Sequence, residues 1–233
     1  MPLVFPAIAP ETRLSQVTLA FLDVETTGLS PRLGHRVIEV AVRRVSGGEV
    51  EQTFQRLINP CRAVSAGITR LTGISDEMVA SAPQFGDIAG ELHEMLRGAV
   101  IVGHNASFDA SFLRSEMSGC GRALCDDLGD PPVLDTLRLA RRICRGQRNG
   151  LSALCARLGV CIESPAHRAM ADCERTHSAM AAMLLPHGGF GLTWREALNL
   201  HGRPGTLRDR TAAPTPRLPQ LELVPGNILP TNA

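Results

Sequence analysis

Two carboxylates stand one residue apart at the end of an apolar segment near the start of the chain. The segment Val17–Asp23 has the composition of a short buried strand, and Asp23 and Glu25 lie at its end. Because side chains alternate along a strand, these two carboxylates project from the same face. Adjacent anions repel unless a cation lies between them, so Asp-x-Glu beside Thr26-Thr27-Gly28 indicates a site for a hard metal ion. A strand end with two solvated acids is the alternative.

Two more segments offer a carboxylate where a strand is expected to end or a helix to begin. Asp109 closes the segment 103–109, which follows the apolar run Ala99–Val102, and ligand sites of α/β proteins gather at the carboxyl ends of such strands. Helix capping is the alternative role for Asp109. Asp172 follows His167 by five residues, a spacing that would turn the two side chains about 140° apart on a regular helix. We therefore place His167 on the incoming loop, from which its side chain can reach a bound substrate.

The elements that must position these residues follow from hydrophobic periodicity. Three antiparallel strands open the fold, with a tight hairpin at Gly47-Gly48, and α/β alternation follows. Strands are expected at Val17–Asp23, Val37–Val45, Glu49–Leu57 and Ala99–Val102 and near Val133. Helices are expected at Gln84–Arg97, Ala106–Met117, Thr136–Cys144, Leu151–Leu158 and Arg168–Leu185, with a further helix-like stretch at Thr193–Leu200. The predicted fold class is α/β, with a mixed sheet flanked by helices.

Length and composition favour one globular domain with appendages. The chain has 233 residues, of which 44% are hydrophobic and 20% are charged. We predict an N-terminal extension over residues 1–16 and a core domain over residues 17–185. Prolines and glycines are frequent in residues 186–233, which predicts a mostly flexible tail.

Composition also argues against several classes of protein. No apolar run approaches membrane-spanning length, and Met1–Arg13 has no basic residue ahead of its apolar stretch, so we expect no membrane contact, no secretory signal and a cytoplasmic location. The seven cysteines are odd in number and lack paired C-x-x-C spacing, which argues against a disulfide framework and a zinc site. The formal net charge is +1, so bulk charge is not the means by which this chain would hold nucleic acid.

Three short motifs together resemble the exonuclease motifs of the DnaQ-like DEDDh superfamily, which contains the proofreading subunit of bacterial replicative DNA polymerase. They are Asp23-Val24-Glu25-Thr26-Thr27-Gly28, His104-Asn105-Ala106-Ser107-Phe108-Asp109 and His167-x4-Asp172. Supporting blocks lie at Leu71–Met78, at Leu134–Thr136 with Leu139–Arg141, and at Asn149–Leu158, so the resemblance covers about residues 18–185. The four spacer residues after His167 are typical of the histidine branch rather than the tyrosine branch.

This resemblance implies a ribonuclease H-like fold and a two-metal-dependent 3′ to 5′ exonuclease. Such an enzyme would release nucleoside 5′-monophosphates from DNA 3′ ends, single-stranded or frayed, in proofreading or repair, with any DNA polymerase subunit acting in trans. Two Mg²⁺ or Mn²⁺ ions would be held by four carboxylates, with His167 as the general base; these ligands are Asp23, Glu25, Asp109 and Asp172. An RNA or oligonucleotide 3′ exonuclease and a non-catalytic adaptor between polymerase and clamp are the alternatives.

By the same resemblance, residues beside these ligands would contact the terminal nucleotide. Thr26, Gly28 and Leu29 would meet it from the end of the first strand, while His104 and Asn105 would shape the pocket floor. A structural hydrogen bond is the alternative role for His104. Phe108, also in the second motif, is assigned to the core rather than to a stacking platform.

A run of arginines follows the strand near Val133 at helix-compatible spacing. Its members are Arg138, Arg141, Arg142, Arg145 and Arg148. Such a stripe can follow a phosphate backbone, and a plain solvated helix face is the alternative.

The tail contains a segment that resembles the Q-L-x-L-F peptide with which bacterial replication and repair proteins dock on the sliding clamp. Gln220, Leu221 and Leu223 hold the anchor positions, and Val224 replaces the terminal aromatic residue. The smaller side chain buries less apolar surface, which is worth about 25 cal/mol per Å². Weak clamp binding is therefore expected, and linker sequence without a partner is the alternative.

Deletion of residues 217–233 should remove binding to a sliding clamp and leave activity on free oligonucleotides unaltered, because the anchors lie outside the predicted core. A pull-down at micromolar protein concentration, with the full chain as the reference, measures this. If the full chain itself fails to bind the clamp, the segment is linker.

Overall fold

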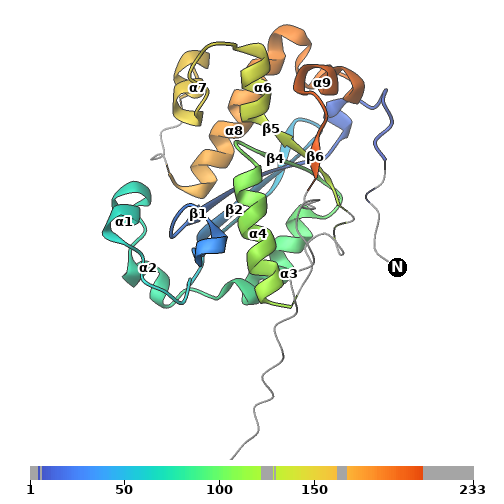
Figure 1. The fold of residues 1–233 in the computed structure, drawn as a ribbon. Coiled ribbons are helices and arrows are strands. Elements are labelled where there is room, and N and C mark those ends of the chain that lie inside the picture. Colours follow the sequence, from blue (N-terminus) through green and yellow to red (C-terminus); the bar gives the residue numbers. More distant parts are fainter. Residues whose placement is uncertain (1–4, 6, 122–127, 129, 162–166, 207–233) are drawn as a thin grey trace, which may run out of the picture.

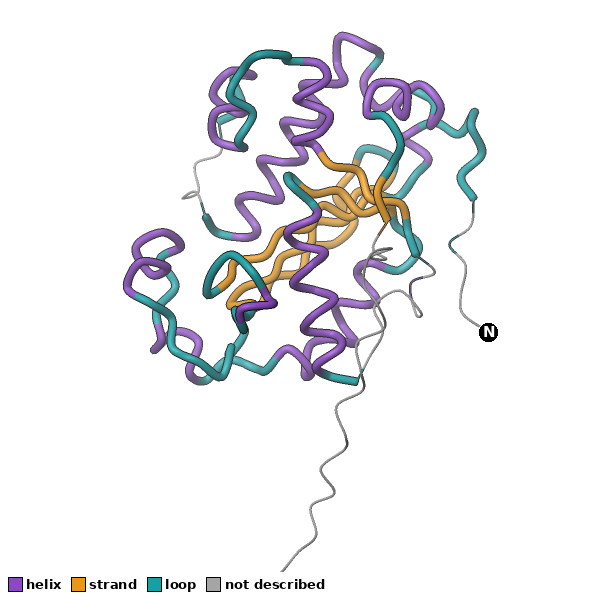
Figure 2. The backbone as a smooth tube through the Cα atoms, viewed as in Figure 1, coloured by secondary structure: helices purple, strands orange, loops and turns teal. Residues whose placement is uncertain are grey.

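The fold is a mixed sheet with helices on both faces (Figures 1 and 2). The computed structural model of the chain describes residue 5 and residues 7–121, 128, 130–161 and 167–206. Within these residues the sheet has six strands in the order β3-β2-β1-β4-β5-β6. Strand β1 pairs antiparallel with β2 and parallel with β4, so the sheet changes direction at β1. The predicted α/β class and mixed sheet are confirmed.

Five of the six described strands occur close to their expected bounds, and β6 was not predicted. The six are β1 (Leu19–Thr26), β2 (Val37–Ser46), β3 (Glu49–Leu57), β4 (Val100–Gly103), β5 (Pro132–Asp135) and β6 (Gly205–Thr206). Gly47 and Gly48 form the predicted hairpin turn, with φ angles of 61° and 86°. Two consecutive positive φ angles suit the tight turns that match the twist of paired strands, which explains the glycine pair.

All the α-helices among the described residues lie between β3 and β6 in the chain. They are α1 (Ala66–Thr72), α2 (Asp76–Ala80), α3 (Phe85–Leu96), α4 (Ser107–Gly119), α6 (Thr136–Ile143), α7 (Leu151–Leu158), α8 (Ala169–Leu184) and α9 (Trp194–His201). Helices α1 and α2 were not predicted, because seven and five residues are too few to show a periodic pattern. No helix among the described residues has both the length and the apolar character to cross a membrane.

The alternation of side chains along β1 decides which layer each residue meets. Its even-numbered apolar residues pack in one core with α3 and α4. Leu19 and Phe21 point the other way, into a second core that includes residues of α6 to α9. Asp23 and Glu25 continue the face of Leu19 and Phe21, so both carboxylates lie on the side of the sheet that α8 covers.

The folded unit continues beyond Leu185, where the sequence predicts the start of a flexible tail. Trp194 and Ala197 of α9 are buried in the same core as α8, and β6 pairs with β5. The predicted boundary at Leu185 is therefore too early, because the Pro- and Gly-rich stretch after it forms short 3-10 turns that lead into α9. Residues 207–233, with the clamp-like segment, lie outside the described residues.

The expected N-terminal extension packs beside the segment that leads into α9 (Figure 1). Backbone hydrogen bonds join the two segments: Leu14 to Leu192 at 2.8 Å, Trp194 to Thr12 at 2.7 Å and Arg195 to Pro10 at 3.0 Å. Leu14 is almost wholly buried. The N-terminal segment is therefore fixed to the segment that enters α9.

Replacing Trp194 by Ala should lower the free energy of unfolding by roughly 3–5 kcal/mol, because a large aromatic side chain leaves the core. Only 7% of this residue is exposed. Denaturant unfolding of the full chain measures the change. Leu185→Ala is the control, since Leu185 is 74% exposed, and its change should stay within about 0.5 kcal/mol. A Trp194 variant as stable as the wild type would show that α9 does not belong to the cooperative unit.

Candidate active site

An open pocket of about 220 Å³ lies where β1 and β4 end. Every residue predicted for the site lines this pocket: Asp23, Glu25, Thr26, Gly28, Leu29, His104, Asn105, Asp109, His167 and Asp172. Three segments that are far apart in the sequence thus meet at one place. The chemical role of each residue remains a prediction.

Each carboxylate reaches the pocket from the end of a strand or the first turn of a helix. Asp23 and Glu25 come from the last residues of β1, and Asp172 comes from the first turn of α8. Asp109 comes from the first turn of α4 and is buried. Its Oδ1 accepts a hydrogen bond from the backbone amide of Val24 at 3.1 Å, which ties α4 to β1. Asp109 therefore does more than cap α4, because its carboxylate also joins that helix to β1.

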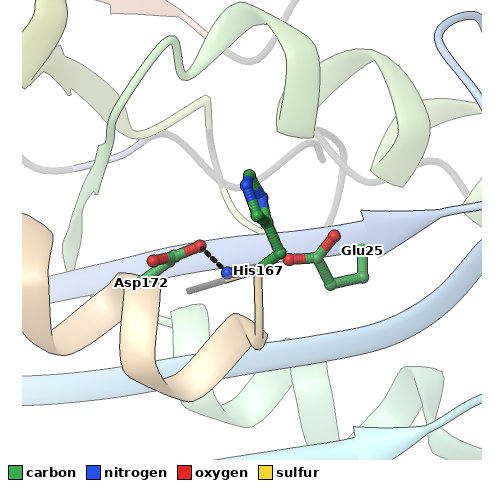
Figure 3. Close-up of side chains that lie close together, drawn as sticks. All are labelled: Glu25, His167 and Asp172. Atoms are coloured by element: carbon green, nitrogen blue, oxygen red, sulfur yellow. Dashed lines mark hydrogen bonds between the residues drawn. The ribbon is translucent and has the colours of Figure 1, made fainter. Parts of the chain in front are cut away.

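Glu25, His167 and Asp172 form the tightest group in the pocket (Figure 3). One ligand atom from each lies within 4.8 Å of the others. His167 precedes α8, as predicted, and its backbone amide donates to Oδ2 of Asp172 at 3.1 Å. Carboxylate and imidazole atoms at this separation can surround a divalent cation. Asp23 and Asp109 line the same pocket but lie outside this group of three.

Burial and neighbouring carboxylates raise the pKa values of three carboxyl groups in the pocket. Burial is the largest cause for Asp23, whose pKa is raised well above its usual range, and the carboxylate of Asp109 raises it further. For Glu25, burial and then Asp172 raise the pKa to about 8. For Asp109, burial raises the pKa to about 8, although the Val24 amide lowers it.

The raised pKa values mean that these carboxyl groups are not all ionised near neutral pH. A divalent cation would favour the ionised carboxylates by opposing both their burial and their mutual repulsion. Oxygen atoms from four carboxylates are also the donors that Mg²⁺ and Mn²⁺ prefer. The residues present therefore fit a hard metal ion.

Asp172 is held by both of its carboxylate oxygens. Oδ1 accepts from Nη1 of Arg175 at 2.8 Å, while Oδ2 accepts from the amide of His167. Arg175 is only 9% exposed, so it brings a buried positive charge next to the carboxylates. The sequence analysis missed this residue, because an arginine one turn beyond Asp172 belongs to no motif that it considered.

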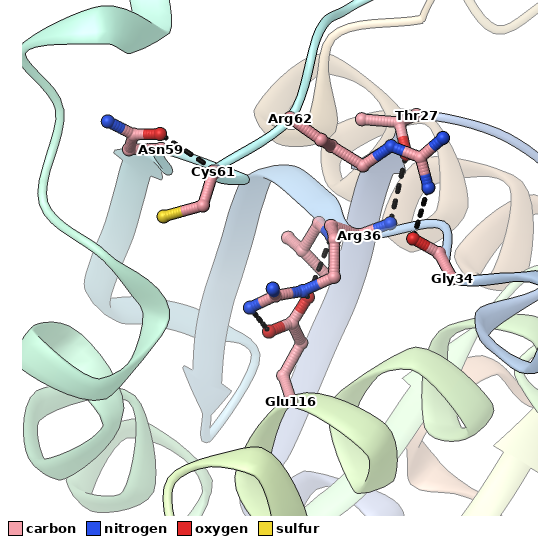
Figure 4. A network of polar contacts seen from close by, with 8 residues as sticks. Thr27, Gly34, Arg36, Asn59, Cys61, Arg62 and Glu116 are labelled. Carbon is pink, nitrogen blue, oxygen red and sulfur yellow. Dashed lines mark hydrogen bonds and ion pairs between the residues drawn. The ribbon is translucent and has the colours of Figure 1, made fainter. Parts of the chain in front are cut away.

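Hydrogen bonds and an ion pair outside the pocket hold the loop between β1 and β2 (Figure 4). The guanidinium of Arg36 donates from Nε and Nη2 to the carboxylate of Glu116 on α4, at 2.9 and 2.7 Å. Its backbone amide donates to Oγ1 of Thr27 at 3.0 Å. Glu116 is buried and also accepts from the amide of Val37 at 3.0 Å. Both ends of the loop are thus tied together, and one is joined to α4.

The same loop presents a polar turn and an apolar tip. Oγ1 of Thr26 donates to the carbonyl of Gly28 at 2.6 Å. The ring of His35 lies so close to Gly28 that a Cβ there would overlap it, which explains the glycine. Leu29 follows at the pocket rim and is 86% exposed.

His104 and Asn105 are held by hydrogen bonds from the pocket floor. Nδ1 of His104 lies 2.9 Å from Oγ1 of Thr136, and its Nε2 lies 2.9 Å from the carbonyl oxygen of Asn149. The structural hydrogen bond considered for His104 is thus present, and the ring also lines the pocket. The amide of Asn105 donates to Oδ1 of Asp135 at 2.9 Å.

Apolar residues that the sequence analysis left out of the site form part of the pocket wall. They are Ile68, Leu71 and Phe108. Phe108 packs against the core, as predicted, with its ring 4.9 Å from that of Phe112. Phe108 lies at the start of α4 and also lines the pocket. The signal for Leu71 was the block Leu71–Met78, which was noted without a role.

The arginine stripe does not form one free helix face. Helix α6 ends at Ile143, so Arg145 and Arg148 lie beyond it. Arg142 donates to the backbone carbonyls of Leu200 and Asn199, at 2.8 and 3.3 Å, and so joins α6 to α9. The predicted stripe is wrong in this respect, because helical spacing does not reveal a neighbouring helix.

Comparison with known proteins gives consistent matches. The family described as Exonuclease (RNase_T) matches residues 20–180. A DNA polymerase III subunit epsilon-like protein of Rhodobacter capsulatus is 37% identical over 210 residues, which cover 87% of this chain and 29% of that protein. A PolC-type DNA polymerase III of Bacillus subtilis is 35% identical over 187 residues, which cover 80% of this chain and 13% of that protein. The chain therefore spans less than a third of the length of either curated relative.

A solved structure shares the fold. Exonuclease X in complex with 5′ overhanging duplex DNA matches with a TM-score of 0.61 and 25% sequence identity, over 79% of this chain and 99% of that one.

Asp109→Asn should weaken the pH dependence of stability in the metal-free protein. A carboxyl group whose pKa rises from 3.8 to about 8 on folding destabilises the fold as it ionises, so stability should fall between these pH values. The amide oxygen of the variant can still accept the Val24 bond, while the charge is gone. Melting temperatures measured in EDTA at several pH values should decline less than in the wild type.

Glu49→Gln is the control for this measurement, because Glu49 is an exposed acid on β3. Mn²⁺ added at pH 8 should raise the melting temperature of the wild type and of the Glu49 variant more than that of the Asp109 variant. An equal pH dependence in all three proteins would contradict the electrostatic account of the pocket.

Proposed function

Because this chain belongs to the exonuclease family, we propose that it is a metal-dependent 3′ to 5′ exonuclease of the DEDDh type, releasing nucleoside 5′-monophosphates from DNA 3′ ends. The observation that carries this proposal is the meeting of four carboxylates and one histidine in a single pocket. The matched relatives are named as DNA polymerase III proteins, and the matched exonuclease structure contains DNA. These names favour DNA as the substrate.

The carboxylates would hold two Mg²⁺ or Mn²⁺ ions. The ligands would be Asp23, Glu25, Asp109 and Asp172. Such ions supply an activated water molecule and stabilise the charge on the leaving oxygen. The raised pKa values of three of these groups in the metal-free protein support this assignment.

His167 would act as the general base. It is exposed at the pocket, and its side chain lies beside Glu25 and Asp172. A neutral imidazole can accept the proton of the attacking water as the new P–O bond forms. The bond from phosphorus to the 3′ oxygen of the preceding nucleotide breaks in the same displacement.

The pocket wall suits the end of a single strand. Leu29, Ile68, Leu71 and Phe108 give the wall an apolar surface in addition to the acids. A nucleobase stacks or packs on apolar side chains without regard to its sequence. The terminal nucleotide would therefore place its base against this surface and its phosphate near the carboxylates, which favours a single-stranded or frayed 3′ end.

Proofreading or repair beside a DNA polymerase is the role that the relatives favour. A sliding clamp would be a second partner, bound weakly through Gln220, Leu221 and Leu223. The presence of all five predicted catalytic residues in one pocket argues against a non-catalytic adaptor.

The purified full chain should shorten 5′-labelled DNA stepwise from its 3′ end in the presence of Mg²⁺. Asp23→Ala should abolish this activity and leave the fold intact, because the substitution removes a ligand and also relieves repulsion between carboxylates. EDTA should silence the wild type and Mn²⁺ should restore it. Matched and mismatched DNA ends and single-stranded RNA of the same sequence are compared in one assay.

Glu51→Ala is the control, since Glu51 is an exposed acid on β3, away from the pocket. Its activity should equal that of the wild type. Cleavage by a folded Asp23 variant, or activity after exhaustive chelation, would refute the proposed site. Faster cleavage of RNA than of DNA would keep the reaction and change the substrate class.

A further inference from the structure

Glu39 is a carboxylate in the middle of the sheet. It lies on β2 between Ile38 and Val40, and none of the residue is exposed. In the antiparallel register it stands directly opposite Glu25. A buried carboxylate is stable only when it is paired and hydrogen-bonded. Glu39 must therefore have a charge partner and hydrogen-bond donors inside the protein.

Four hydrogen bonds reach the two carboxylate oxygens of Glu39. Arg168 donates from Nη2 to Oε1 at 2.7 Å and from Nε to Oε2 at 3.1 Å. The backbone amide of Ala169 donates to Oε2 at 3.0 Å, and Nε2 of Gln55 donates to Oε1 at 2.9 Å. Three of the four bonds thus come from the two residues that directly follow His167.

The backbone of His167 adopts a conformation that needs such support. Its φ angle is 61°, in the left-handed region that residues other than glycine seldom occupy. Strained residues of this kind persist where their surroundings fix them on every side. The carboxylate of Asp172 accepts a hydrogen bond from the backbone amide of His167 at 3.1 Å. The carboxylate of Glu39 accepts hydrogen bonds from the next two residues, Arg168 and Ala169.

We propose that Glu39 and Arg168 are positioning residues that hold His167 in place to act as the general base. This inference rests on the proposed nuclease function. The ion pair anchors the start of α8 to β2, directly across from Glu25. Neither residue lines the pocket, so both act through His167.

A second ion pair between the same two elements offers a matched control. Nη1 of Arg43 on β2 lies 2.9 Å from Oε1 of Glu174 on α8. Neither Arg43 nor Glu174 lines the pocket. Loss of this pair removes a bond between β2 and α8 without releasing His167.

Arg168→Gln should lower kcat roughly 10- to 100-fold, the usual effect of losing a group that orients a functional side chain. KM should change little, because the pocket wall is intact. Arg43→Gln should alter neither constant. Equal kcat values for the Arg168 variant and the wild type would overturn the proposal.

Removal of Arg168 alone leaves a buried, unpaired Glu39 that can unfold the protein. The double variant Glu39→Gln with Arg168→Gln removes both charges at once. Thermal melting should show that it is folded, and its kcat should fall as in the single variant. A folded double variant with wild-type kcat would overturn the proposal.

Combining Arg168→Gln with His167→Ala distinguishes an effect on the position of His167 from a general loss of structure. If Arg168 acts through His167, then Arg168→Gln should lower kcat no further in a chain that already carries His167→Ala. Losses that multiply would show that Arg168 acts elsewhere.

Hydrogen exchange in the metal-free protein tests the geometry without activity. The amides of His167 and Ala169 should exchange faster in Arg168→Gln than in Arg43→Gln, since only the former frees this segment. Faster exchange in a protein without nuclease activity would support the positioning and refute the proposed function. Unchanged exchange would overturn the positioning.

Discussion

Carboxylates that share one pocket repel one another, and this repulsion governs how the rest of the structure is arranged. Burial adds to it, as the raised pKa values of Asp23, Glu25 and Asp109 show. Two arginines lie close by, with Arg175 bonded to Asp172 and Arg168 bonded to Glu39. Neither fills the pocket, so the space between the acids is left for a cation. The fold thus holds the carboxylates in place, and neither arginine neutralises them within the pocket.

Ion pairs behind the pocket hold its walls. Arg36 and Glu116 join the β1–β2 loop to α4, and Arg168 and Glu39 join the start of α8 to β2. Each pair has one nearly inaccessible carboxylate that also accepts from a backbone amide. Such carboxylates specify the position of a segment as well as its charge partner. The pocket is therefore bordered by loops whose ends are fixed, even though Leu29 at the rim is exposed.

Local signals predicted most of the fold and the residues of the pocket, and they failed where tertiary contacts decide. The alternation of β1 placed Asp23 and Glu25 on one face, and the loop position of His167 followed from helical geometry. The helix α9 was expected, yet its burial was not, because composition cannot show that a Pro- and Gly-rich stretch folds back on a sheet edge. Glu39 offered a signal that went unused, since an acid within Val37–Val42 implies a buried partner. Arg175 offered none.

The backbone bonds between residues 10–14 and 192–195 fasten the N-terminal segment to the segment that enters α9. They meet on the side of the sheet where β1 begins, away from the pocket where it ends. Sequence joined ahead of residue 10 would therefore meet the folded unit on the side away from the pocket. Relatives such as the Rhodobacter capsulatus and Bacillus subtilis proteins, of which this chain spans 29% and 13%, carry the matching segment within much longer chains. Attachment on the side away from the pocket makes that kind of modular reuse sterically simple.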